Sequence, residues 1–383
     1  MSINATMLRH GLQIATIVTV VASGAAKAEG NSGGDQARVR AAVAYLDARQ
    51  EAWSKFAKAE RGEGADKTTC VSCHTGISYT LARPSLRKFN ADPGPSAREE
   101  KIVSAVSLRV EHWEGLDSAR FRLMYDSDDR KKAESRGTEA VINALVLARD
   151  DATRGRATAS TLTRTALRHL WAAQLTSGPH AGSWDWLDFG LAPWEAGGSR
   201  AFGASLAALA VGSAPGCLEG SLDEGASRGV DLLRDYVRRR FPEETLYNRL
   251  WILEASTKFE GLLSPEEKRE VVEQLLALQR EDGGWALAPL GGFQRVDGTA
   301  QDEDSDGYAT ALAIHSLLRA GLPSARPELA KGLIWLRSHQ REDGSWPGRS
   351  VNKERDPSTF VGKLMSDAAT ALAAQALVES ESK

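Results

Sequence analysis

The sequence contains little sulfur and almost no net charge. Its 383 residues include three cysteines and four methionines, and the formal net charge is −3. Three cysteines do not make a disulfide framework in a chain of this length, and the missing basic excess argues against a nucleic-acid partner. Beyond residue 28, no stretch approaches the roughly 20 apolar residues of a membrane-spanning helix. The hydrophobic content of 42% nevertheless supports a large buried core.

The first 28 residues have the layout of a secretory signal. A lightly basic start is followed by the apolar stretch LQIATIVTVVASGAA and by AKA at positions 26–28. This predicts a cleavable signal peptide over residues 1–28 and a single mature domain over residues 29–383, periplasmic or otherwise exported, with no integral membrane span after cleavage. A retained signal anchor is the alternative.

A short repeat recurs along the mature chain. The segments QLLALQREDGGW (274–285) and WLRSHQREDGSW (335–346) align without a gap, and HLWAAQLTSGPHAGSW (169–184) and AAVAYLDARQ (41–50) are looser copies. Each full copy ends a helical pattern in Gln, followed by a Gly turn and Trp. Gly permits a left-handed helix cap, and the Trp and Gln side chains can cover the carbonyl end of the helix. We therefore assign them a structural role.

Amphipathic and apolar segments alternate. Segments with one charged face begin near residues 38, 98, 160, 222, 264 and 327, and Ala-rich segments that are apolar nearly all round begin near 76, 136, 198, 245, 306 and 367. The first kind suits solvent-facing helices and the second suits buried ones. The pattern predicts an all-α protein, an α/α toroid of six outer and six inner helices. Its long loops, 56–76, 115–136, 176–198, 281–306 and 341–366, then emerge on one face, where function usually resides.

The last repeat resembles the repeat motif of the squalene-hopene and oxidosqualene cyclases. The resemblance implies the toroid of the terpenoid cyclase and prenyltransferase families, but the D-x-D-D acid motif of the cyclases and the zinc ligands of the prenyltransferases are missing. Cyclase activity is therefore not expected. The matching residues are Lys331, Gly332, Trp335, Leu336, Gln340, Gly344 and Trp346.

The acidic run DEDSDG (302–307) precedes the fifth apolar segment. Its carboxylates favour helix capping and solvation. Asp302, Asp304 and Asp306 also match the first half of a calcium loop, but the twelfth position is Ala313 in place of Glu. A calcium site is the weaker hypothesis, and an acid catalyst is weaker still.

The segment CVSCH contains the strongest chemical signal. In the C-x-x-C-H pattern of c-type cytochromes, which the chain resembles over these few residues only, each thiol adds to one haem vinyl group and the histidine binds the iron. Cys70 and Cys73 are thus the predicted attachment sites of haem c, and His74 is the predicted proximal iron ligand. Two alternatives are a zinc site, which needs a second Cys or His pair that the chain lacks, and a redox dithiol.

The second axial ligand is a separate question. If the ring closes, the first and sixth inner helices are neighbours, which makes Met365 the first candidate for the distal ligand. Met124, His112 and His180 lie on the same face, and no protein ligand at all is the remaining option. His315 and His339 fall within predicted helices, and we assign both a structural role.

Aromatic residues gather in the predicted loop over residues 178–198 and near the fifth inner helix. They are predicted to wall the haem or an apolar guest at the rim of the cavity, with packing between loop and ring as the plain alternative. These residues are Trp184, Trp186, Phe189, Trp194 and Tyr308.

Together these features predict an exported mono-haem c-type protein with a redox function. Electron transfer with a redox partner protein is the leading hypothesis. One alternative is a haem-dependent oxidoreductase or peroxidase that acts on an apolar, isoprenoid-like substrate in the toroid cavity. Another is a protein that binds or senses a small apolar ligand or a lipid.

Overall fold

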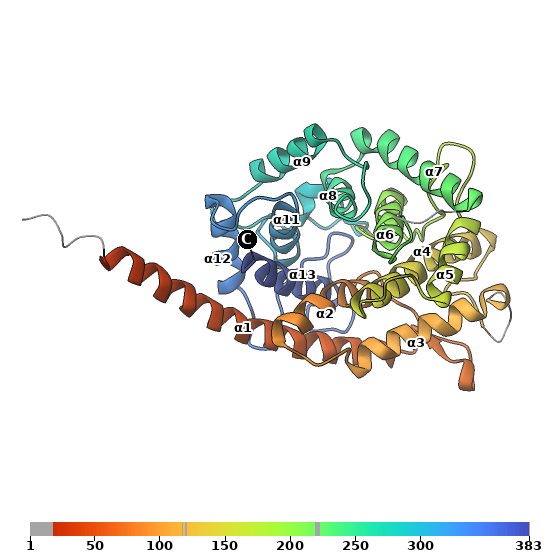
Figure 1. Cartoon of the computed structure of the whole chain (residues 1–383), viewed down its shortest axis with the longest axis horizontal. Helices are drawn as coiled ribbons and strands as arrows, with labels where there is room; N and C mark the ends of the chain where they lie inside the picture. Colours follow the sequence, from red (N-terminus) through yellow and green to blue (C-terminus); the bar gives the residue numbers. More distant parts are fainter. Residues whose placement is uncertain (1–17, 117, 119–120, 219–222, 383) are drawn as a thin grey trace, which may run out of the picture.

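The helices of the protein form a closed double ring (Figure 1). The computed structural model describes residues 18–116, 118, 121–218 and 223–382, and the first 17 residues of the predicted signal peptide lie outside this range. None of the described helices combines the length and the apolar composition that crossing a membrane requires.

Outer and inner helices alternate along the chain as the sequence predicts. The outer helices are α1 (Val18–Ser54), α3 (Ala97–Glu111), α5 (Thr161–Ala172), α7 (Glu224–Arg240), α9 (Pro265–Ala277) and α12 (Pro327–Ser338). The inner helices are α2 (Gly76–Asn90), α4 (Asp129–Thr153), α6 (Arg200–Ser213), α8 (Leu246–Ala255), α11 (Gly307–Arg319) and α13 (Leu364–Ser380). The predicted α/α toroid is confirmed.

The rim loops contain little further regular structure. A small antiparallel hairpin pairs β1 (Glu60–Arg61) with β2 (Thr68–Thr69), and α10 (Leu287–Gly291) is a single turn. Short 3-10 turns lie at Gly64–Asp66, Trp113–Gly115, Gly197–Ser199 and Phe241–Glu243.

Two helices begin earlier than the sequence predicts. Helix α1 is already helical at Val18, where the described residues begin, and not only from residue 38, and α4 starts at Asp129 and not near residue 136. At the start of α4, the Asp128 side chain accepts a hydrogen bond from the backbone N–H of Lys131. The cap satisfies a backbone N–H at the start of the helix, and the polar residues that follow are good helix formers. The helix therefore begins before its buried part.

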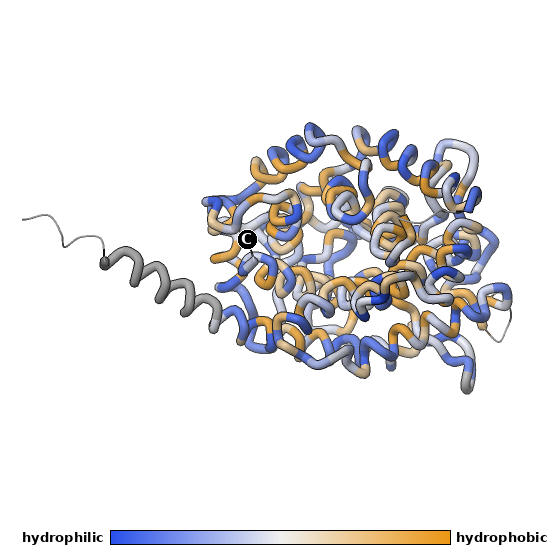
Figure 2. The backbone as a smooth tube through the Cα atoms, in the orientation of Figure 1, coloured by the Kyte–Doolittle hydropathy of each residue, from blue (hydrophilic) through white to orange (hydrophobic). Residues whose placement is uncertain are grey.

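Burial separates the two layers. The inner helices contact one another in the order α2, α4, α6, α8, α11, α13 and back to α2. Nearly every residue of α6 is buried, and alanines there let neighbouring helices approach closely. Figure 2 shows hydrophilic residues on the outward side of α7 and α9, and mainly hydrophobic residues facing inward.

The repeat residues tie each outer helix to the next. The indole N–H groups of Trp184, Trp285 and Trp346 donate to carbonyls in the last turn of the preceding outer helix, at 2.7, 2.8 and 2.8 Å. The Gln279 amide donates to the Gly283 and Glu328 carbonyls, so it also reaches the following outer helix. The predicted structural role of these residues is confirmed.

Glycine is required in the turn of each full repeat. Gly182, Gly283 and Gly344 have φ angles of 96°, 87° and 85°. A Cβ at Gly344 would also lie 2.3 Å from the Ala41 carbonyl oxygen in α1. The turn therefore needs both the left-handed backbone and the missing side chain.

The C-terminal ends of the inner helices converge on a buried ion cluster. His315 of α11 lies with Nε2 3.1 Å from Glu254 of α8 and with Nδ1 3.0 Å from Glu379 of α13. Arg319 contacts both carboxylates. Burial alone would lower the pKa of His315, but the two carboxylates raise it to about 9. The predicted structural role of His315 is consistent with this arrangement, whereas His339 caps the end of α12 and stacks on Trp335 at 3.9 Å.

The raised pKa of His315 predicts a loss of stability in alkali. The unfolded value is about 6.5, so the stabilisation is complete below that pH and is lost as the pH rises to about 9. The expected loss is on the order of 3 kcal/mol at most. Urea unfolding of the wild type between pH 6 and 10 measures it. The His315→Gln variant should be less stable at pH 6 and show a flatter profile. Equal slopes for the two proteins would contradict the assignment.

Candidate functional site

The segment CVSCH lies between the β hairpin and α2, and several hydrogen bonds hold it in place. The Cys70 N–H donates to the Ala59 carbonyl at 2.9 Å, and the Trp53 indole donates to the Cys70 carbonyl at 2.7 Å. The Ser72 hydroxyl accepts from the backbone N–H groups of Thr75 and Gly76. These contacts fix the segment against the end of α1 and the start of α2.

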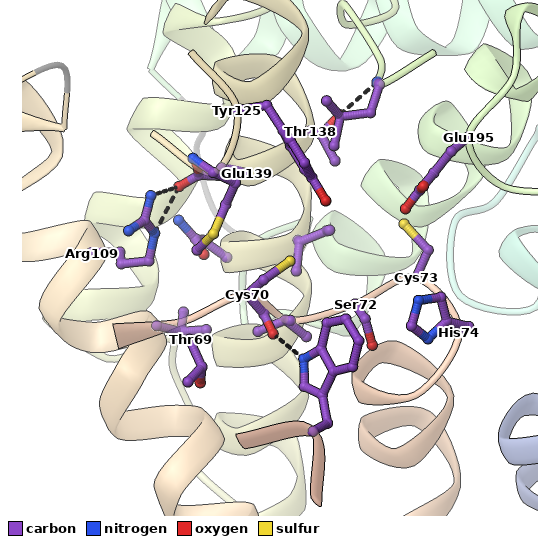
Figure 3. Close-up of a pocket in the computed structure, with 17 residues that line it drawn as sticks. Thr69, Cys70, Ser72, Cys73, His74, Arg109, Tyr125, Thr138, Glu139 and Glu195 are labelled. Carbon is purple, nitrogen blue, oxygen red and sulfur yellow. Dashed lines mark hydrogen bonds and ion pairs between the residues drawn. The ribbon is translucent and has the colours of Figure 1, made fainter. Parts of the chain in front are cut away.

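Two adjoining cavities meet at this segment. An inner cavity of about 80 Å³ is lined by both thiols and by residues of α4 and of the 178–198 loop (Figure 3). A larger cleft of about 750 Å³ opens toward the rim. Cofactor sites in proteins span about 300–1,000 Å³, so the cleft has a suitable size. The residues shared by the two cavities are Trp53, Cys70, His74, Met124 and Tyr125.

His74 is held as a neutral imidazole with one nitrogen engaged. Burial, reinforced by the nearby Arg49 and Arg355, lowers the pKa of His74 to about 3. Its Nδ1 lies 3.0 Å from the Thr75 hydroxyl oxygen, and this hydroxyl donates to Asp367 at 2.7 Å. Because the hydroxyl proton points to Asp367, its oxygen accepts from Nδ1–H. The tautomer that remains has its lone pair on Nε2, as metal-binding histidines require.

A buried carboxylate anchors this arrangement. Asp367, near the start of α13, accepts from the Tyr45 hydroxyl at 3.0 Å and from Arg49 at 2.7 and 3.1 Å. It thus connects α1, the loop before α2 and α13. Sequence reasoning did not single out Thr75 or Asp367, because the two residues are 292 positions apart.

The two thiols stay protonated in this environment. Burial raises the pKa of Cys70 to about 12 and that of Cys73 well above its usual value. Cys73 also shares a hydrogen bond with Glu195, whose pKa burial raises to about 7. Figure 3 shows the Cys73 sulfur and the Glu195 carboxyl pointing toward each other.

A satisfied ion pair forms another wall of the inner cavity. Arg109 of α3 donates to Glu139 of α4, and Glu139 also accepts from the Met124 backbone N–H at 3.0 Å. Arg109 reaches Thr68 of β2 as well, at 3.1 Å. Burial of a charged pair is tolerated here because its hydrogen-bonding groups are matched.

The structure brings Met124, and not Met365, into contact with these cavities. Met124 lines both of them, whereas Met365 lines neither and is buried at the start of α13 against the Gly348 segment. The predicted proximity of the first and sixth inner helices is confirmed, since α2 and α13 pack together. Ring order alone does not set the direction of a side chain. His112 stacks on Phe121 at 4.0 Å, and His180 also lines neither cavity.

The predicted rim aromatics pack mainly against other parts of the ring. Trp184 lies against Trp171 and Trp186 against Phe202, whereas Phe189 is 37% exposed. Four of the five predicted side chains are buried and line neither of the two cavities: Trp184, Trp186, Trp194 and Tyr308. Trp194 does approach His74, with ring centroids 6.2 Å apart, and meets Tyr308 on its other side at 5.5 Å. Tyr308 in turn bonds Tyr247 through their hydroxyls at 2.9 Å. These contacts agree with packing between the loop and the ring, and not with side chains that wall a cavity.

The acidic run is engaged by protein groups. Asp302 pairs with Arg295 and Arg349, and Asp304 pairs with Arg349. Asp306 accepts from the first N–H groups of α11, as expected for a helix cap. Among the described residues, no three His, Cys, Asp or Glu side chains gather in a way that could hold a metal ion.

The protonated thiols predict slow alkylation of the folded, haem-free protein. Thiolate is the reactive form, so Cys70 and Cys73 should react with iodoacetamide at pH 8 at least about 100-fold more slowly than in urea. Peptide mass spectrometry measures each site. Burial raises the pKa of Cys217 as well, so the reagent is checked with an added small thiol and not with Cys217. Fast reaction of Cys73 in the folded protein would contradict its burial.

No protein-family model matches this chain. Two solved structures resemble it in fold. An unsaturated glucuronyl hydrolase from Bacillus sp. GL1 aligns with 91% of this chain and 95% of its own, at 14% identity and a TM-score of 0.48. The type II terpene cyclase MstE from Scytonema aligns with 92% of this chain and 99% of its own, at 16% identity and a TM-score of 0.46. Likeness at this level of identity concerns the fold alone.

Proposed function

We propose that the protein is an exported mono-haem c-type redox protein that transfers electrons to or from a partner protein. Cys70 and Cys73 would hold the haem through thioether bonds, and His74 Nε2 would bind its iron. The bound haem supplies a one-electron centre. The observation that carries the proposal is the chain from His74 through Thr75 to Asp367, since it presents a neutral imidazole with free Nε2 beside two thiols at attachment spacing.

The size and lining of the cleft beside Cys70 support the proposal. Its volume of about 750 Å³ is within the range of cofactor sites. Phe56 and Phe360, stacked at 4.6 Å, give it an apolar wall. Lys58 also lines it and offers a cationic partner for a carboxylate, whereas Arg122 is already paired with Asp126. The cleft opens at the rim, which suits electron exchange with a docked protein.

The alternatives for the two cysteines have weaker support. A redox dithiol needs a thiol of lowered pKa, whereas burial raises the pKa of both Cys70 and Cys73. A structural zinc needs four ligands, and the described residues offer no such cluster. Export, proposed from residues 1–28, agrees with haem attachment because c-type attachment takes place outside the cytoplasm.

Expression with the native signal peptide, in a host that matures c-type cytochromes, tests the proposal. The mature protein should retain one haem mass after denaturation and show a c-type absorption band on reduction. Cys70→Ser combined with Cys73→Ser should abolish covalent haem, while Cys217→Ser should keep it. A wild-type protein without covalent haem, from a host that matures a control cytochrome, would refute the proposal.

Loss of the Thr75 hydroxyl should raise the reduction potential. In Thr75→Val, His74 Nδ1 has no acceptor, so the imidazole becomes a weaker donor and the oxidised iron is less stabilised. One hydrogen bond of about 0.5–1.5 kcal/mol corresponds to roughly 20–60 mV for a one-electron couple. Spectroelectrochemical titration measures the shift.

Thr80→Val is the matched control for this measurement. Thr80 also lies on α2, its hydroxyl has no hydrogen-bond partner, and it lines neither of the two cavities. The control should keep the wild-type potential. An unchanged potential in Thr75→Val would show that the contact does not act on the ligand.

A further inference from the structure

A methionine borders both cavities at the CVSCH segment. Met124 lies in the rim loop before α4, is 5% exposed and lines the inner cavity as well as the cleft. Beyond the predicted signal peptide the chain contains one other methionine, Met365, which lines neither. A buried methionine is often only a core filler, so a role for Met124 needs evidence from its surroundings.

The backbone of Met124 is held on both sides. Its N–H donates to the Glu139 carboxylate at 3.0 Å, and its carbonyl accepts from Arg61 Nε at 2.9 Å. The N–H of the next residue, Tyr125, donates to the Ser135 hydroxyl at 3.1 Å. Three side chains therefore fix the loop at this point, which gives Met124 a defined position beside the cavities.

The same contacts connect Met124 to the hairpin that leads into the thiols. The arginine that holds the Met124 carbonyl lies on β1. The Glu139 carboxylate is bound by Arg109, which also donates to the Thr68 hydroxyl of β2 at 3.1 Å. Strand β2 ends immediately before Cys70. Two independent routes thus tie this methionine to the start of the attachment segment.

The positions of the two thiols limit where a haem can lie. Cys70 lines both cavities, whereas Cys73 lines only the inner one. A haem joined to both would therefore cross the boundary between the two spaces, and the inner cavity of about 80 Å³ is too small to hold all of it. The residues that border both spaces are therefore the candidates for axial ligands.

Of the five residues that the cavities share, only one suits the second axial position. Cys70 is an attachment site and His74 is the proposed first ligand. The Trp53 indole N–H can only donate and is already bound to the Cys70 carbonyl. Tyrosine binds iron as a phenolate, and burial raises the pKa of Tyr125. The thioether of Met124 is a neutral, soft donor that loses no proton when it binds.

We propose that the Met124 sulfur is the second axial ligand of the haem iron, opposite His74. The inference rests on the proposed function, which assigns only the first ligand. A thioether stabilises ferrous iron and raises the reduction potential. With both axial positions filled by the protein, the iron has no open position for oxygen or peroxide. The ligand set therefore favours electron transfer over a haem-dependent oxidoreductase.

Methyl-labelled methionine tests the inference directly. The chain beyond the predicted signal peptide contains only Met124 and Met365, so the mature protein gives two labelled methyl signals in an NMR spectrum. In the reduced, haem-loaded protein, the haem ring shifts the methyl signal of an iron-bound methionine far upfield. We expect one such signal, absent from Met124→Leu and kept in Met365→Leu. A Met to Leu change costs little in a core, so both variants should fold.

Visible spectra of the same proteins give a second readout. The oxidised wild type and the Met365→Leu control should be low-spin, whereas Met124→Leu should become high-spin. Reduced Met124→Leu should bind carbon monoxide at least about tenfold more tightly than the wild type, because no internal ligand competes. Met124→His supplies another iron ligand and should restore the low-spin spectrum. This rescue separates ligation from packing, since His does not replace the packing of Met.

The results separate this inference from the proposed function. A haem-loaded wild type without the upfield methyl signal, or with a signal that disappears in Met365→Leu, would overturn the inference and leave the haem assignment intact. An unchanged spin state and carbon monoxide affinity in Met124→Leu would do the same. The wild-type NMR spectrum decides the question if Met124→Leu does not fold. A wild type without covalent haem would overturn the proposed function and the inference together.

Discussion

The Asp367 carboxylate is the contact on which both the ring and the site depend. It is buried at the start of α13 and accepts hydrogen bonds from Tyr45 and Arg49 of α1 and from Thr75 at the entry to α2. The same contact that closes the ring therefore also orients His74. A buried carboxylate is stable only when such donors surround it, so the three segments hold one another in place.

The outer layer closes by a different means from the inner one. Inner helices meet through small apolar side chains, whereas outer helices are joined by amide-to-carbonyl bonds at the repeat turns. Gln340 donates to the Gly344 carbonyl and to the Arg38 carbonyl of α1, so the last repeat joins the first outer helix. This division leaves the rim loops free to differ from repeat to repeat, and it is in the first of them that the thiols lie.

The features that the sequence predicted correctly are those that depend on residues close together in the chain. The alternation of outer and inner helices, the caps at Trp285 and Trp346 and the grouping of Cys70 with His74 all follow from residues a few positions apart. The position of Met365 did not follow, because ring order places a helix but not the direction of its side chain. Asp367 has significance only through its contacts with Tyr45, Arg49 and Thr75, which are distant in the sequence. No spacing in the sequence marks it, and its role appears only when the ring is closed.

The burial of Cys73 has a consequence for biogenesis. Its side chain is 4% exposed and faces Glu195, which lies in a loop 122 positions later in the numbering. Thioether formation needs access to this sulfur, and the closed ring denies it. If the chain carries haem as proposed, attachment would precede closure, and α13 would dock against a segment that already holds its cofactor. Release of the haem would then need cleavage of covalent bonds as well as reopening of the contact between α2 and α13.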